Sequence, residues 1–87
     1  MNGAAEFIQT ARHCAGLFRL GRDVDAALRM VELFTVLMPR FLEQPPEVQQ
    51  EWLRLLTLML SCQETRDVLG LADYLEYELV DLLQATA

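Results

Sequence analysis

Residues 23–38 read DVDAALRMVELFTVLM, and as a helix this segment is apolar on almost every side. Its polar residues Asp25, Arg29 and Glu32 recur at helical spacing and form one narrow polar stripe. Two apolar stripes fill the rest of the surface. The first contains Val24, Ala27, Leu28, Val31 and Phe34, and the second contains Ala26, Met30, Leu33 and Leu37. Such a helix must be covered on two sides, so the other segments are expected to pack around it.

The chain of 87 residues is long enough for one domain, residues 1–87. A domain of this size buries roughly 60 to 65% of the surface that its unfolded chain exposes, so its core is limited. Apolar residues make up 53% of the sequence, which is more than a lone small bundle hides. We therefore expect a protein partner to cover part of the apolar surface.

The charge and the cysteines narrow the class of protein. The net charge is -6, and the seven basic residues are all arginines scattered along the chain. Binding to nucleic acid or to an anionic membrane needs a clustered basic surface, so neither is expected. Cys14 and Cys62 match no metal or disulfide spacing and are interpreted as small buried hydrophobic residues in a reducing compartment. The N-terminus lacks the pattern of a signal peptide, and no apolar run approaches a membrane span, so a cytoplasmic location is expected.

Helical periodicity predicts four helices and hence an all-α fold. The predicted helices cover residues 4–20, 23–38 with a possible extension to 42, 46–64 and 67–84. We interpret them as two antiparallel αα-hairpins, 4–42 and 46–84, joined by a proline linker at 43–46. The predicted architecture is a compact bundle that forms a dimer.

Turn and cap residues mark the predicted helix ends. Gly21 supplies a left-handed stop after the first helix, and Asp23 and Asp67 are expected to cap the second and fourth helices. Pro39 removes an amide donor, so the second helix should end near Met38 or bend there. The predicted core faces of the other three helices are Ala4, Phe7, Ile8, Ala11, Cys14, Ala15 and Phe18, then Val48, Trp52, Leu55, Leu56, Met59 and either Cys62 or Gln63, and finally Val68, Leu71, Ala72, Leu75, Leu79, Leu82 and Leu83.

The search for catalytic chemistry gives few candidates. His13 is the only histidine, it assembles no metal set or nucleophile pair, and no phosphate-binding or nucleophile motif occurs. No catalytic residue, cofactor or metal ligand is therefore predicted. An acidic cluster on the last helix keeps a metal-dependent enzyme open as the alternative, although Glu76 and Glu78 point about 200° apart on an ideal helix. A solvated acidic face is the favoured interpretation of this cluster, which contains Asp73, Glu76, Glu78 and Asp81.

The segment DVLGLADYLEYEL, residues 67–79, resembles a C-terminal pattern in short, poorly characterised helical proteins of bacteria. In size, acidity and helical-hairpin layout, the chain is also similar to two groups of small bacterial proteins. The first group is export chaperones for flagellar or type III secretion subunits. The second is antiactivators that bind a transcription factor, such as those of quorum sensing. The resemblance implies a protein that captures another protein.

Together these observations predict a non-enzymatic module that binds and sequesters or regulates a protein partner, and that is itself a homodimer. Only one apolar stripe of residues 23–42 can face the core of its own chain, so the other is expected to form the dimer seam. The predicted seam is Met30, Leu33, Leu37 and Phe41. Aromatic rings beside carboxylates favour protein recognition, and the predicted partner-binding residues are Tyr74, Tyr77, Glu76 and Leu42.

Overall fold

The computed structural model describes residues 3–86, and within that range it contains helices and connecting turns only. The helices are α1 (Gly3–Arg19), α2 (Asp23–Leu42), α3 (Pro46–Glu64), α4 (Val68–Asp73), the π-helical segment η1 (Tyr74–Glu78) and α5 (Leu79–Ala85). The last three segments follow one another without a break, and we call them together the C-terminal helix. The predicted all-α class and four-helix content are confirmed.

The turn between α1 and α2 depends on Gly21. Its φ of +77° lies in the left-handed region that glycine adopts without strain, as the sequence predicted for the end of the first helix. The predicted cap of α2 is wrong, because Asp23 is the first helical residue and Arg22 precedes it at the cap position, with no side-chain cap bond. Asp23 and Asp25 instead place negative charge in the first turn, where the helix dipole favours it.

Pro39 lies inside α2, which continues through it to Leu42. Of the two predicted outcomes, an end near Met38 is therefore wrong, and a bend at Pro39 stays a prediction. A proline lacks the amide that would bond to the carbonyl four residues back, here that of Thr35. Thr35 is exposed, so water can reach this part of the helix, while Phe41 is buried at the end of α2 and helps to hold the last turn in place.

The other two helix starts agree with prediction. Pro46 stands in the first turn of α3, where its missing amide costs nothing. Asp67 caps α4, since its side chain accepts a hydrogen bond of 3.0 Å from the amide of Gly70. Arg66, directly before this cap, has a positive φ of 58°.

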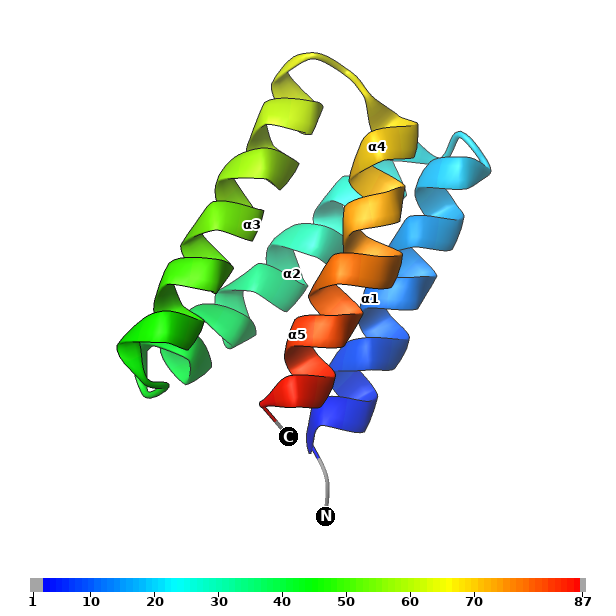
Figure 1. Cartoon of the computed structure of the whole chain (residues 1–87). Helices are drawn as coiled ribbons and strands as arrows, with labels where there is room; N and C mark the ends of the chain where they lie inside the picture. The colour runs from blue at the N-terminus through cyan, green and yellow to red at the C-terminus, as the bar shows by residue number, and fades with distance from the viewer. Residues whose placement is uncertain (1–2, 87) are drawn as a thin grey trace.

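The four helices form a bundle in which each pair of neighbours is visible in Figure 1. α1 packs against α2 on one side and against the C-terminal helix on the other, and α3 also contacts both of these helices. α2 and the C-terminal helix therefore lie diagonally across the bundle, with α2 behind and the C-terminal helix in front in Figure 1. None of the described helices is both long and apolar enough to span a membrane.

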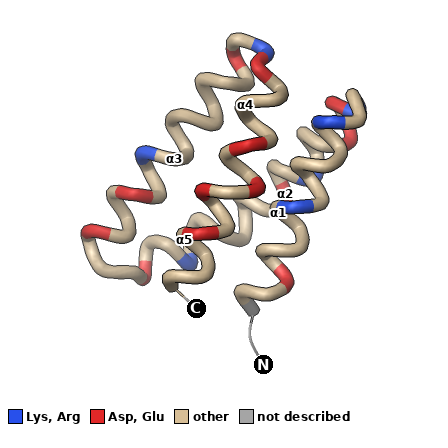
Figure 2. Tube along the Cα trace, turned by 45° about the vertical axis from the view of Figure 1, so that its right-hand side comes forward, with Lys and Arg blue, Asp and Glu red and all other residues tan. Residues whose placement is uncertain are grey.

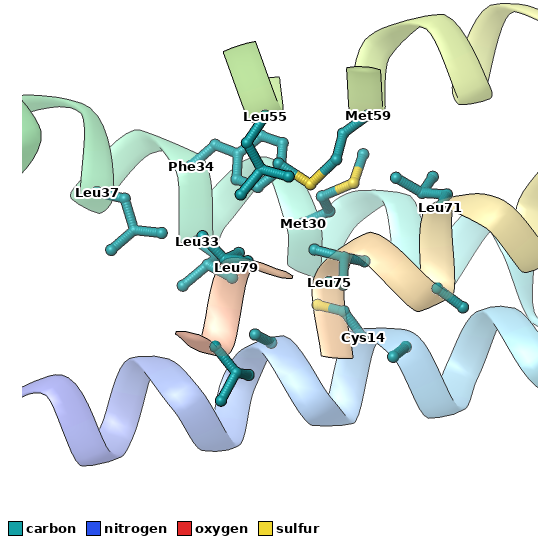
Figure 3. Close-up of a cluster of buried hydrophobic side chains, with 14 of the residues drawn as sticks. Cys14, Met30, Leu33, Phe34, Leu37, Leu55, Met59, Leu71, Leu75 and Leu79 are labelled. Atoms are coloured by element: carbon teal, nitrogen blue, oxygen red, sulfur yellow. The ribbon is translucent and has the colours of Figure 1, made fainter. Parts of the chain in front are cut away.

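One apolar cluster fills the centre of the bundle (Figure 3), and no polar side chain among the described residues is buried in it. α1 contributes the small side chains Ala11, Cys14 and Ala15, which allow its neighbours to approach closely. α3 contributes Trp52, which is 3% exposed. The core faces predicted for α1, α3 and the C-terminal helix are confirmed, since the residues named for them are buried or partly buried. Of the two alternatives at the end of α3, Cys62 is the partly buried one and Gln63 is exposed.

Candidate functional site

The four residues predicted to form a dimer seam lie inside the bundle. Met30 and Leu33 are 2% exposed and Leu37 is fully buried (Figure 3). Phe41 is 3% exposed and also belongs to the core. They contact the chain's own helices and are unavailable to a second copy. This assignment of the seam is therefore corrected: the sequence analysis placed the inward stripe of α2 on the outside. Whether the chain associates with itself stays a prediction.

The stripe that α2 presents to solvent is the opposite one. Its residues follow one another at steps of four, three, four, three and four along the helix, and none of them is covered by the chain. Val24 at its start is 75% exposed and Leu42 at its end is 71% exposed. We call this set the outer stripe, and it consists of Val24, Leu28, Val31, Thr35, Met38 and Leu42.

The outer stripe runs beside the junction of α2 with α3. Phe34 stands between Val31 and Met38 on the helix surface, and its ring meets Trp52 of α3 edge-on, with centroids 5.6 Å apart. One turn after Trp52, Leu56 is only partly buried. The neighbouring apolar side chains of α3, Leu53 and Leu60, are exposed. Exposed apolar side chains therefore occur on both helices of the α2–α3 pair.

Charged residues border the outer stripe along one edge of α2. The acids on this edge, Asp25 and Glu32, each pair with an arginine three residues before them. Arg22 approaches Asp25 to 2.5 Å, and Arg29 approaches Glu32 to 4.0 Å. Both pairs are exposed and contribute little to stability. Their effect is to leave this edge close to electrically neutral.

The acidic residues gather instead on the C-terminal helix, as Figure 2 shows. Arg19 of α1 bonds to both Asp73 and Glu76, each at 2.8 Å. Arg54 of α3 bonds to Glu78 at 3.0 Å and also to Glu51 on its own helix. The cluster therefore connects the C-terminal helix to both neighbouring helices, and its carboxylates are already paired with arginines at these points.

The hydrogen bond from Tyr77 and the charge of Arg19 hold the pKa of Glu76 below its usual value. The same hydrogen bond raises the pKa of the Tyr77 hydroxyl. Glu76 was predicted to bind a partner, but in the structure its carboxylate is engaged by groups of its own chain.

The other predicted partner-binding residues do not meet on one surface. Tyr77 is 59% exposed on the outside of the C-terminal helix, whereas Tyr74 is partly buried against the core. Leu42 is exposed at the end of α2, diagonally across the bundle. The structure thus separates Leu42, which belongs to the outer stripe, from the two tyrosines.

The π-helical segment η1 is a feature that the sequence analysis missed. It contains both tyrosines, and the amide of Leu79 bonds to the carbonyl of Tyr74, five residues back. One signal was present in the sequence: Leu71, Leu75 and Leu79 recur every four residues. On a regular α-helix each such step drifts by about 40°, so a wider turn is needed to keep these leucines on one face.

The reactive side chains among the described residues include the His13 imidazole, the two cysteine thiols and the carboxylates of the C-terminal helix. Within residues 3–86, no three His, Cys, Asp or Glu side chains lie close enough together to hold a metal ion. Burial raises the pKa of the Cys14 thiol to about 11, which suppresses its thiolate form. His13 lies in an open groove between α1 and α2, beside Arg29 and Glu32. This arrangement offers contacts to a ligand but no activated nucleophile.

No family model, no curated protein and no solved structure matches the chain.

Proposed function

We propose that the protein is a non-enzymatic interaction module that binds a helical segment of a polypeptide through the outer stripe of α2. The observation that supports this proposal is the run of exposed apolar residues at alternating steps of three and four. That spacing is the one by which one helix packs along another. Exposed apolar patches of this continuity mark interaction surfaces in soluble proteins.

The role that we propose is capture and sequestration of a protein, in the manner of small export chaperones or antiactivators. Amphipathic helices commonly bind by laying their apolar face along such a surface. We propose that the chain works in the cytoplasm, because both of its cysteines are free thiols. We also propose that its helices are organised as two αα-hairpins, in which α1 is paired with α2 and α3 with the C-terminal helix.

Tyr77 is a second candidate contact for the partner. Its exposed ring offers a large, rigid area with a polar tip, which is typical of residues that dominate binding. Tyr74 lies in the same π-helical segment, and we propose that its partly buried ring adds to this contact. Because Tyr77 and the outer stripe lie on different sides of the bundle, this contact would engage a separate part of the partner.

Leucines of equal exposure allow a matched test of the outer stripe. Leu28 in the stripe is 60% exposed, and Leu69 on α4 is 62% exposed. Each is changed to Glu, and the immobilised variants are used to capture polypeptides from the native host, with quantification by mass spectrometry. We expect Leu28→Glu to lose a polypeptide that wild type and Leu69→Glu retain. Equal capture by all three proteins would show that the outer stripe is not the binding site.

The alternative function, a metal-dependent enzyme that uses the acidic cluster, predicts a different result. A protein that binds a catalytic metal is stabilised by it, so its melting temperature should rise with millimolar Mg²⁺, Mn²⁺ or Zn²⁺. Unchanged melting with all three ions would remove this alternative, and a rise that Glu78→Gln abolishes would support it.

A further inference from the structure

We infer that the outer stripe of α2 packs against the same stripe of a second copy, with the two α2 helices antiparallel. This inference rests on the proposed function, since it names the polypeptide that the helix-docking surface holds. It differs from the seam predicted from the sequence, whose residues are buried. The two copies would be related by a twofold axis, so the same residues contribute from both sides.

The order of residues along the stripe is complementary to its own reverse. With the helices antiparallel and centred between residues 31 and 35, Val24 of one copy faces Leu42 of the other, Leu28 faces Met38, and Val31 faces Thr35. Each layer thus contains one residue from each half of the stripe. The layers away from the axis pair two apolar side chains, as a helix–helix seam requires.

Thr35 is the one polar residue in the stripe, and its hydroxyl already has a partner. It donates a hydrogen bond of 2.8 Å to the carbonyl of Val31 in the preceding turn. The hydroxyl is therefore satisfied when the stripe is covered, and its methyl group can pack against Val31 of the second copy. The central layers can therefore be buried without an unpaired hydroxyl. The carbonyl of Thr35, which Pro39 leaves without an amide partner, must keep its access to water at the edge of the seam.

The distribution of charge favours a second copy as the occupant. α2 carries three acidic and two basic residues, and so is nearly neutral. The C-terminal helix carries four acidic residues, its cap Asp67 adds a fifth, and residues 67–86 contain no lysine or arginine. Because this helix lies diagonally across the bundle from α2, two copies that meet through α2 keep their acidic helices far apart. A strongly basic partner, in contrast, would find little attraction at this surface.

The outer stripe supplies about half of the area that a standard interface buries on each partner. Burial of an aliphatic side chain removes on the order of 100 Å², so the five apolar residues of the stripe supply roughly 400 Å² per copy at their present exposure. A standard interface buries about 800 Å² per partner. The charged edge of α2, which contains Asp25, Arg29 and Glu32, borders the stripe and extends the surface toward that size.

A parallel arrangement is less favourable for two reasons. It would place the acidic first turns of both α2 helices side by side and align their dipoles in the same direction. It would also set Thr35 against Thr35 in the middle of the seam. The antiparallel arrangement avoids both.

Light scattering on purified protein tests the association. Wild type and Leu69→Glu should give about twice the 10.0 kDa mass of one chain at tens of micromolar, and Leu28→Glu should give the monomer mass with unchanged helical circular dichroism. Val31→Glu provides a second variant should Leu28→Glu fold poorly. A wild-type monomer at this concentration would overturn the inference, as would a dimer that survives both substitutions. If the wild-type protein is a monomer but still captures another polypeptide through Leu28, the proposed function stands and only the dimer is wrong. If the protein neither forms a dimer nor captures a polypeptide through the outer stripe, both the dimer and the proposed function are wrong.

Disulfide cross-linking tests the orientation. In a Cys62→Ser background, which leaves only the buried Cys14, Val24→Cys and Leu42→Cys chains are refolded together and mildly oxidised. We expect a linked heterodimer of one chain of each kind, and little linkage when either variant is refolded alone. Efficient linkage of Val24→Cys to itself would overturn the antiparallel register.

Discussion

The rings of Phe41 and Trp52 stack with their centroids 4.6 Å apart and their planes inclined by 11°. The ring of Phe34 also contacts Trp52, edge-on, with an angle of 86° between the two ring planes. These rings join α2 to α3, two helices that otherwise touch over a short length. The position of α3, and hence the apolar surface beside the outer stripe, depends on this aromatic group.

Replacement of Trp52 by Ala should cost about 3 to 5 kcal/mol, because it removes a buried aromatic side chain and leaves a cavity. This is a large part of the roughly 5 to 15 kcal/mol that stabilises a small domain. Urea unfolding followed by circular dichroism measures the change. Leu53→Ala, at the next position and exposed, is the control and should lie near wild type. A stable Trp52→Ala protein would mean that α2 and α3 do not depend on the stacked rings.

The same substitution should have opposite effects at two glycines. Gly16 lies in mid-helix with open space around its Cβ position, so Gly16→Ala should stabilise the protein by about 0.5 to 1 kcal/mol. A Cβ at Gly70 would collide with the carboxylate of Asp67, which caps α4. Gly70→Ala should therefore destabilise the protein by about 1 kcal/mol, the usual value of a lost cap. Thermal melts of both variants decide the signs, and a stabilising Gly70→Ala would show that the cap adapts.

The stability of the protein should fall in acid through two glutamates. The pKa of Glu76 is lowered by the Tyr77 hydrogen bond and by Arg19, and that of Glu51 is lowered by its hydrogen bond to Arg54. A carboxyl group whose pKa is lower in the folded state stabilises that state at any pH above its pKa in the unfolded chain, here 4.5. This stabilisation is lost as the pH falls through the pKa of the folded state. We expect Glu76→Gln to lower the melting temperature at pH 7 and to differ less from wild type at pH 3. A difference that is constant with pH would contradict this assignment.

The two cysteines should react with thiol reagents at very different rates. Cys14 is fully buried and its pKa is raised to about 11, whereas Cys62 is partly exposed. At pH 8 the native protein should incorporate label at Cys62 alone, slowly, because burial also raises the pKa of that thiol. Mass spectrometry of intact protein counts the labels. In Cys62→Ser the native chain should remain unlabelled until denaturant is added, and rapid labelling would reveal that α1 opens.

The sequence was sufficient for the helices because glycine and proline mark their ends. Gly21 and Pro46 lie where the backbone turns, and Trp52 lies on the only continuous apolar face of its helix. On α2 the pattern was ambiguous. Both stripes are apolar at the same spacing, so periodicity alone could not tell which one faces inward. That choice is made by long-range contacts such as those of Trp52 with Phe34 and Phe41.

The candidate site was less predictable from the sequence, because long-range contacts also decide which of its residues are exposed and which lie together. Glu76 seemed free for a partner because nothing in the local sequence shows that Arg19, far along the chain, reaches it. Leu42 and Tyr77 are both exposed, but only the packing of the helices shows that they lie on different sides. The π-helical turn at Tyr74–Glu78 is likewise a response to packing, which keeps leucines spaced by four on the core side.

The small side chains of α1 limit how this protein can vary. Ala11, Cys14 and Ala15 are all fully buried beside neighbouring helices, so a larger residue at any of these sites must displace an entire helix rather than one flexible side chain. The exposed positions on α2 have no such restriction within one chain. In a deep mutational scan scored for folding alone, we expect α1 to accept only Ala, Ser, Gly or Cys at these three sites, while Val24, Leu28 and Val31 tolerate polar replacements freely. When the same scan is scored for association, we expect polar replacements at Val24, Leu28 and Val31 to be rejected. The two scores would separate the residues that maintain the fold from those that bind a partner.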